Sequence, residues 1–221
     1  MESILPIQAV LFDYGMVLSG PADPSAWARM RSLTGHDETT LHHAYWEPRH
    51  DYDRGALTGR EYWTQVAAAG ENHTDLAFDQ LIDHLIAADT DLWTQPNQPM
   101  IDWALSLQKA GIRTGILSNL GDAMTEGVLS RHPWLNGFYH RTFSYTLGTA
   151  KPDLAIYAHA ATGLETPPEN ILFIDDREDN IAAAQAAGMQ TLRYTTHTAF
   201  EQEMHSRSLD SLLHPEINAH P

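Results

Sequence analysis

Aspartate side chains follow two of the apolar runs in this 221-residue chain. Residues 9–12 lead into Asp13, and residues 171–174 lead into Asp175 and Asp176. Short apolar runs bounded by turn residues predict parallel strands buried on both faces, and ligands bind beyond the carboxyl ends of such strands. We therefore expect the three carboxylates to share one crevice. The alternative is that each aspartate only caps the helix that follows it.

Three carboxylates that lie close together repel, and this repulsion raises their pKa values unless a cation holds them ionised. Magnesium prefers oxygen ligands of this kind, and it commonly takes one or two protein carboxylates together with a substrate phosphate. The sequence therefore predicts a Mg²⁺ site beyond the ends of these strands.

Further polar residues stand between the aspartates in the sequence. The apolar run 114–117 ends in Ser118 and Asn119, and Lys151 with Pro152 precedes a helical stretch. Pro152 suits the first turn of a helix, which would place Lys151 at the mouth of that helix. Taken alone, Ser118 would be an ordinary strand-end hydroxyl and Lys151 a solvated surface cation. The order of the segments favours a common site instead.

Four segments together resemble the four motifs of the haloacid dehalogenase-like hydrolase superfamily: 12–18, 116–119, 151–153 and 173–180. The resemblance extends from residue 9 to about residue 194, so it covers most of the chain. The first motif, Asp-x-Gly-x-Val, is similar to that of a small-molecule phosphatase subgroup that includes sugar-phosphate phosphatases. The resemblance implies a magnesium-dependent phosphatase of a small phosphorylated metabolite.

The resemblance also implies a role for each acidic position. Asp13 would be the nucleophile, which attacks the phosphoryl group and forms an aspartyl-phosphate that water then hydrolyses. Magnesium would contact Asp13, the backbone carbonyl of Gly15 and the side chain of Asp176. Asp175 would complete the acidic metal site and, with Asn180, would act through waters or hydrogen bonds.

Phosphoryl transfer also needs donors for the oxygens of the transferred group, because its catalysis is mostly positioning and charge stabilisation. The resemblance assigns this role to the hydroxyl of Ser118, the backbone amide of Asn119 and the ammonium group of Lys151. These three residues would bind the phosphate.

The chain departs from the family pattern at Gly15. Many phosphatases of the superfamily carry a second aspartate there, which protonates the leaving oxygen and later activates water. A positioned acid or base contributes about 10²–10⁴ in rate. Three explanations stay open: a substrate with a good leaving group, such as a sugar 1-phosphate or an acyl phosphate; a proton donor elsewhere, for instance a histidine; or slow catalysis.

Two other functions stay open as alternatives. A metal-independent haloacid dehalogenase also has a non-acidic residue at this position, but the adjacent Asp175 and Asp176 argue against a metal-free site. A phosphate-binding regulatory protein with little turnover is the second alternative, and Gly15 is the feature that supports it. Four arginines could hold a carboxylate, but we expect them in solvent because they lie on helical segments: Arg29, Arg31, Arg49 and Arg54.

The chain fits one α/β domain with an insertion. Residues 1–20 and 96–221 are interpreted as a Rossmann-like core, a doubly wound parallel sheet flanked by helices. Residues 21–95 lack buried-strand runs, carry a capping-box pattern at 58–61 and an apolar helix face at 81–86, and are interpreted as a small helical cap. Six cap side chains are available to face a substrate: His42, His43, Tyr45, Trp46, Tyr52 and Arg54.

The composition limits the partners. Thirteen Lys and Arg against 29 Asp and Glu give a formal net charge of −16, which repels nucleic acid and anionic membrane surfaces at long range. The chain has no cysteine, so disulfides and thiolate chemistry are excluded. No run approaches the roughly 18 apolar residues of a membrane span. We expect a cytoplasmic protein, a monomer or a homodimer.

Overall fold

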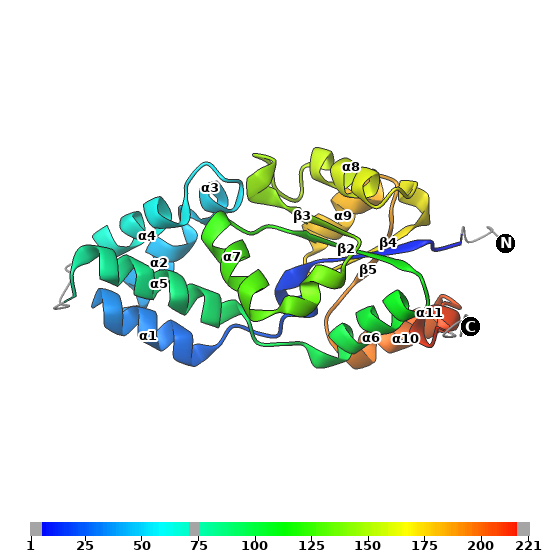
Figure 1. Ribbon diagram of the computed structural model, residues 1–221, viewed down its shortest axis with the longest axis horizontal. Coiled ribbons are helices and arrows are strands. Elements are labelled where there is room, and N and C mark those ends of the chain that lie inside the picture. The colour runs from blue at the N-terminus through cyan, green and yellow to red at the C-terminus, as the bar shows by residue number, and fades with distance from the viewer. Residues whose placement is uncertain (1–5, 71–75, 216–221) are drawn as a thin grey trace.

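Five strands form one parallel sheet in the order β3-β2-β1-β4-β5 (Figure 1). The computed structural model describes residues 6–70 and 76–215, so parts of the predicted core and cap (1–5, 71–75 and 216–221) lie outside the described residues. The strands are β1 Ala9–Phe12, β2 Arg113–Ser118, β3 His140–Phe143, β4 Ile171–Asp175 and β5 Gln190–Arg193. Each neighbouring pair runs parallel. The predicted doubly wound parallel sheet is confirmed.

Helices cover both faces of this sheet (Figure 1). Val10 and Phe12 of β1 belong to one apolar cluster, and Ala9 and Leu11 belong to the other, as expected of a strand buried on both faces. The α-helices that follow residue 97 in the chain are α6 Gln98–Lys109, α7 Asp122–Arg131, α8 Leu154–Gly163, α9 Glu178–Ala186, α10 His197–Ser206 and α11 Asp210–Leu213. α8 and α9 share the Leu11 cluster, and apolar residues of α6, α7, α10 and α11 join the Phe12 cluster.

The stretch between β1 and α6 is helical, as predicted. Its elements are the short turn η1 Tyr14–Leu18, α1 Pro24–Thr34, α2 Glu38–Trp46, α3 Arg49–Asp53, α4 Gly59–Ala68 and α5 Phe78–Trp93. α5 packs along α1 and α4, and the buried Tyr45, Tyr62 and Trp63 pack against one another. The predicted capping box of Thr58 and Glu61 is present at the start of α4. The division into a core (1–20 and 96–221) and a cap (21–95) stays a prediction.

Arg49 contradicts the expectation that the arginines of this stretch are solvated. Its guanidinium group is buried, whereas the side chains of the other three stay between 43% and 47% exposed. It forms ion pairs with Asp53 at 3.0 Å and Asp89 at 3.4 Å, and it donates to the Tyr45 hydroxyl at 2.5 Å. The Tyr45 hydroxyl in turn donates to Asp89 at 2.7 Å. Two carboxylates therefore compensate the burial of this cation.

The helical stretch contacts the rest of the chain through closely approaching backbones. A Cβ atom at Gly121, before α7, would overlap the ring of Tyr52. A Cβ atom at Gly55, whose φ is +76°, would lie 2.5 Å from the carbonyl oxygen of Tyr145. The Tyr52 hydroxyl accepts a hydrogen bond from the backbone amide of Met124 at 2.9 Å. Glycine is needed at both positions because any side chain would separate the two surfaces.

Among residues 6–70 and 76–215, no helix combines the length and the apolarity that crossing a membrane requires. Pro152 corrects one local expectation: α8 begins at Leu154 with Asp153 as its N-cap, so Pro152 precedes the helix and does not occupy its first turn. The Asp153 side chain accepts a hydrogen bond from the amide of Ala155 and provides the helix start.

The buried ion network of Arg49 yields a stability prediction. We expect Asp89→Ala to lower the free energy of unfolding by about 3 kcal/mol, because Arg49 then stays buried with one carboxylate fewer. Asp83→Ala on the same helix is the matched control, since Asp83 is exposed and pairs with the exposed Arg60. It should cost less than about 1 kcal/mol. Equal losses in urea denaturation would contradict the assignment.

Candidate active site

The register of the sheet brings the predicted residues to one edge. Phe12 of β1 pairs with Ile116 of β2 and Ile174 of β4, so Asp13 lies level with the end of β4 and one residue before the end of β2. The amide of Asp13 donates to the carbonyl of Ile174 at 2.9 Å. Ser118 ends β2 and Asp175 ends β4. Three neighbouring strands therefore deliver polar side chains to the same place.

The three predicted carboxylates lie together. Asp13, Asp175 and Asp176 each offer one oxygen, and these oxygens all lie within 4.8 Å of one another. Lys151 joins them: its Nζ atom lies 2.9 Å from Asp13 Oδ1 and 2.6 Å from Asp175 Oδ2. Its side chain and that of Asp175 are buried. Lys151 is therefore not the solvated surface cation that an isolated lysine would be.

Two asparagines hold this cluster in place. The side chain of Asn119 donates to the carbonyl of Lys151 at 2.9 Å and accepts from its amide at 2.8 Å. The side-chain amide of Asn180 donates to both oxygens of Asp175 at 3.0 Å, and the backbone amide of Arg177 donates to Asp175 Oδ1 at 2.8 Å. The sequence predicted a role for the backbone of Asn119; the positioning role of its side chain was missed.

The segment after Asp13 turns sharply. The amide of Tyr14 donates to Asp13 Oδ1 at 2.6 Å, and Gly15 has ordinary extended dihedral angles (φ −63°, ψ 133°). Met16 has a φ of +57°, in the left-handed region that residues other than Gly and Asn rarely adopt. A Cβ atom at Gly15 would meet nothing within 4 Å. Neither backbone angles nor space therefore requires glycine at position 15.

The charges at the site shift one another's pKa values. Burial raises the pKa of Asp13 to about 7; Asp175 adds to this effect, and Lys151 and Ser118 oppose it. Burial acts to lower the pKa of Lys151, but the attraction of Asp13 and Asp175 outweighs it and the pKa is raised. Burial, followed by repulsion from Asp175, also raises the pKa of Asp176. Lys151 therefore stays cationic, and the acidic cluster needs further positive charge to be fully ionised.

All these side chains except Asp175 line one cavity of about 290 Å³. Its other lining residues come partly from the helical stretch: Trp46, Arg49, Asp53 and Trp93. Trp46 is the one predicted cap side chain that lines this cavity; His42, His43, Tyr45, Tyr52 and Arg54 do not. Tyr45 and Tyr52 are buried in the packing of the helices instead.

Sequence reasoning missed Arg49, Asp53 and Trp93 as cavity residues. Burial raises the pKa of Asp53 to about 6, although Arg49 acts against this effect. The spacing of four residues between Arg49 and Asp53 on one helix indicates an ion pair, but it gives no sign that the pair is buried. Trp93 ends α5, far in sequence from any predicted site residue.

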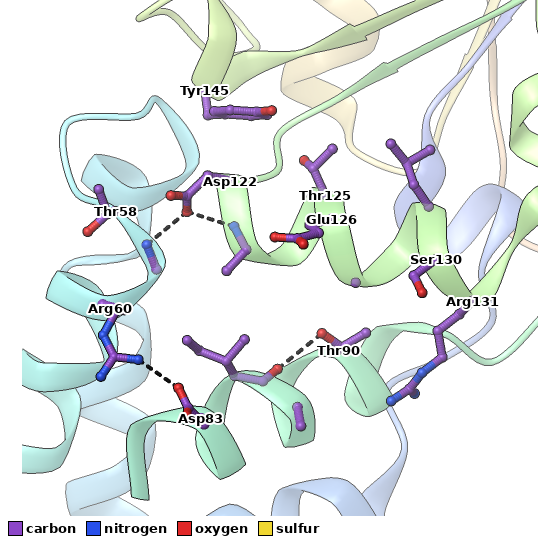
Figure 2. Close-up of a pocket in the computed structure, with 16 residues that line it drawn as sticks. Thr58, Arg60, Asp83, Thr90, Asp122, Thr125, Glu126, Ser130, Arg131 and Tyr145 are labelled. Carbon is purple, nitrogen blue, oxygen red and sulfur yellow. Dashed lines mark hydrogen bonds and ion pairs between the residues drawn. The ribbon is translucent and has the colours of Figure 1, made fainter. Parts of the chain in front are cut away.

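A larger hollow of about 1010 Å³ lies elsewhere and contains none of the predicted site residues. Figure 2 shows it between α7, which contributes Asp122, Thr125 and Glu126, and the helices α4 and α5 with Arg60 and Asp83. Arg60 pairs with Asp83, and Asp122 accepts from the amide of Gly59 across the gap. The predicted site residues therefore line the smaller of these two hollows.

Comparison with known proteins identifies the family. Residues 7–188 match the model of a family described as haloacid dehalogenase-like hydrolase. The chain belongs to the haloacid dehalogenase-like hydrolases, and the predicted family is confirmed.

Two curated relatives are similar over much of this chain. A drimenol cyclase of Aspergillus calidoustus is 24% identical over 190 residues, which make up 85% of this chain and 34% of the relative. The chain thus spans about a third of the length of that protein. A sesquiterpene phosphatase of Aspergillus oryzae is 27% identical over 161 residues, 69% of this chain and 82% of the relative.

Solved structures share the fold. A HAD-family enzyme of Bacteroides thetaiotaomicron aligns with a TM-score of 0.74 and 19% identity over 90% of this chain and 99% of its own. The same enzyme in complex with magnesium and inorganic phosphate aligns with a TM-score of 0.66, 19% identity and 86% and 96% coverage. An L-2-haloacid dehalogenase of Xanthobacter autotrophicus aligns with a TM-score of 0.64, 19% identity and 96% and 90% coverage. At these identities the likeness shows the fold alone.

The donor set of the site fits magnesium. Three carboxylates offer hard oxygen atoms within one ion's reach, and the raised pKa values of Asp13 and Asp176 indicate a shortage of positive charge. No nitrogen or sulfur ligand belongs to this set of described residues, so a softer metal is not favoured.

If Asp13 binds Mg²⁺, protons should compete with the ion for its carboxylate. Because the pKa of Asp13 is about 7, the carboxyl group becomes increasingly protonated as the pH falls below that value. We expect the apparent Mg²⁺ affinity, measured by titration calorimetry, to fall by up to about tenfold per pH unit below the pKa. Asp176→Asn should weaken binding at every pH, whereas Asp102→Asn, on the exposed face of α6, should leave it unchanged. A pH-independent affinity would contradict the assignment.

Proposed function

We propose that this chain is a magnesium-dependent phosphatase that hydrolyses a small phosphorylated metabolite through an aspartyl-phosphate on Asp13. The observation that carries the proposal is the arrangement of Asp13, Asp176, Ser118 and Lys151 around one cavity at the carboxyl edge of the sheet. This set offers a nucleophile, oxygen ligands for a cation and donors for a phosphoryl group.

In the proposed reaction a carboxylate oxygen of Asp13 attacks phosphorus, and the bond between phosphorus and the ester oxygen breaks. The leaving oxygen of an ester takes a proton from solvent water and departs as an alcohol, whereas that of an acyl phosphate departs as a carboxylate. Water then attacks the aspartyl-phosphate, which releases inorganic phosphate and restores the carboxylate. Division of the reaction into two displacements explains why a buried carboxylate stands at this position.

The remaining residues position and stabilise charge. Lys151, the Ser118 hydroxyl and the Asn119 amide are the donors proposed for the phosphoryl oxygens. Asp13, Asp176 and the carbonyl of Gly15 are the proposed Mg²⁺ ligands, with Asp175 and Asn180 in support. When bound, magnesium would offset the negative charge of the phosphate and of the acidic cluster. Asn119 keeps Lys151 in place through its two hydrogen bonds.

The comparisons support a phosphatase over the alternatives. A relative aligned over 82% of its length is a sesquiterpene phosphatase, and a structural neighbour binds magnesium and phosphate. A metal-free dehalogenase would gain nothing from Asp176 beside Asp13 and Asp175, because additional anions repel a carboxylate substrate. These arguments favour phosphate ester hydrolysis.

The missing acid at Gly15 bears on the leaving group of the substrate and on the rate of turnover. No histidine belongs to the described residues that line the cavity, so the idea of a histidine proton donor gains no support. The remaining explanations are a good leaving group or slow turnover. An acid at position 15 would add little for a good leaving group such as a carboxylate, whereas without that acid an alkoxide departs slowly.

The first test is phosphate release from a panel of phosphate esters and acyl phosphates, with and without Mg²⁺. We expect Asp13→Asn to lower kcat at least about 10⁴-fold, because the nucleophile is lost, and Asp102→Asn to match the wild type. If no member of the panel releases phosphate, but beryllium fluoride binds the wild type and not Asp13→Asn, the regulatory alternative would replace the phosphatase. Haloacid turnover without metal would favour the dehalogenase.

Gly15→Asp tests the departure from the family directly. The variant should fold, because its Cβ meets open space and the backbone angles suit any residue. We expect kcat for esters with poor leaving groups to rise by about 10²-fold or more, and kcat for acyl phosphates to change little. Gly15→Asn is the matched control, since it adds the same volume without an acid. An equal gain in both variants would contradict acid catalysis.

A further inference from the structure

A second cavity adjoins the catalytic one and shares two of its walls. It has a volume of about 290 Å³, and Trp46 and Trp93 line both cavities. The two indole rings lie 6.5 Å apart, edge to face. The same pair of rings therefore borders both the space beside Asp13 and the space beside Trp27.

The second cavity is predominantly apolar. Its other walls include Trp27, Pro24 and Leu92. The polar atoms of these walls are largely engaged: Trp27 Nε1 donates to Glu38 at 2.8 Å, and Trp93 Nε1 donates to the Tyr45 hydroxyl at 2.9 Å. The rings therefore present carbon faces, which suit hydrocarbon better than a sugar or another polar group.

The charged groups of the second cavity are also committed to the fold. Asp23 accepts from the amide of Ser25 at the start of α1, and Glu38 forms an ion pair with Arg31 at 3.0 Å. Neither carboxylate requires a ligand to satisfy it. His42 also lines the cavity, and its ring packs against Trp27 and Trp46. Apart from this imidazole, the lining provides little to recognise a charged or polyhydroxylated substituent.

Met16 adds an apolar surface at the catalytic end. It lines the catalytic cavity, it is 40% exposed, and its φ of +57° is in the left-handed region. That conformation costs a residue with a Cβ about 1–2 kcal/mol, and exposure of a methionine brings no compensating burial. Trp46 is 47% exposed nearby. Contact with an apolar ligand would explain why the side chains of Met16 and Trp46 are exposed at this cavity.

We propose that the substrate is a phosphate monoester of an alcohol with a long apolar chain, whose hydrocarbon lies along Met16, Trp46 and Trp93 and ends in the cavity beside Trp27. This inference rests on the proposed function, because it places the phosphate at Asp13. The inference adds the chemical class of the leaving group, a long-chain alcohol.

The expected signature is a dependence on chain length. In a series from ethyl to dodecyl phosphate, assayed below the concentrations at which micelles form, KM should fall by about three- to fourfold for each methylene that leaves water. The fall should stop when the second cavity is filled. kcat should change much less, because the chain contacts the protein equally before and during the reaction.

Trp46→Ser tests the shared wall. It should reduce the ratio of kcat/KM between decyl and ethyl phosphate by at least about tenfold. Phe78→Ser is the matched control, because Phe78 is 49% exposed, as exposed as Trp46, but lines neither cavity. The control should keep the wild-type ratio. Circular dichroism would verify that both variants fold.

A second measurement separates this inference from the proposed function. Alkyl phosphonates cannot be hydrolysed, so the chain-length dependence of their binding with Mg²⁺, measured by titration calorimetry, reports the subsite without turnover. Chain-length-dependent binding that Trp46→Ser weakens, without hydrolysis of any alkyl phosphate, would support the apolar subsite and overturn the phosphatase. Hydrolysis and binding that are both independent of chain length would overturn the subsite and leave the phosphatase standing. A chain-length effect that Trp46→Ser leaves intact would also overturn the apolar subsite.

Discussion

The ammonium group of Lys151, buried between Asp13 and Asp175, is the interaction on which the site depends. A buried charge without a partner costs several kcal/mol, so the two carboxylates and the ammonium group require one another. Asp13 follows β1, Asp175 ends β4, and Lys151 precedes α8. One ion cluster therefore joins three segments that are distant in sequence, and it leaves an excess of negative charge that a divalent cation can balance.

The hydrogen bonds around this cluster explain its geometry. Asn180 donates to both oxygens of Asp175, which leaves that carboxylate little freedom to rotate. Asn119 binds both the amide and the carbonyl of Lys151, which fixes the lysine backbone against the end of β2. The carboxylate and the lysine that flank Asp13 are therefore held in place by two asparagines. Such support is what keeps a reactive site within the narrow tolerance that phosphoryl transfer needs.

The core of the fold and most of the site could be predicted because both are encoded locally. Each short apolar run predicted a strand, and Asp13, Ser118 and Asp175 were recognisable because they end such runs. The burial of Arg49 could not be predicted, because it depends on Asp89, 40 residues further along the chain. Trp93 was missed for the same reason. Which side chains meet within the helical stretch depends on how its helices pack, and the periodicity of the sequence does not indicate this packing.

The close contacts at Gly55 and Gly121 have a consequence for redesign of the chain. Both positions lie where the helical stretch meets the core, and a side chain at Gly55 would collide with Tyr145 and one at Gly121 with Tyr52. A mutant library that aims at new specificity should therefore keep these two glycines fixed. Diversity belongs at the more exposed cavity positions such as Trp46 and Met16.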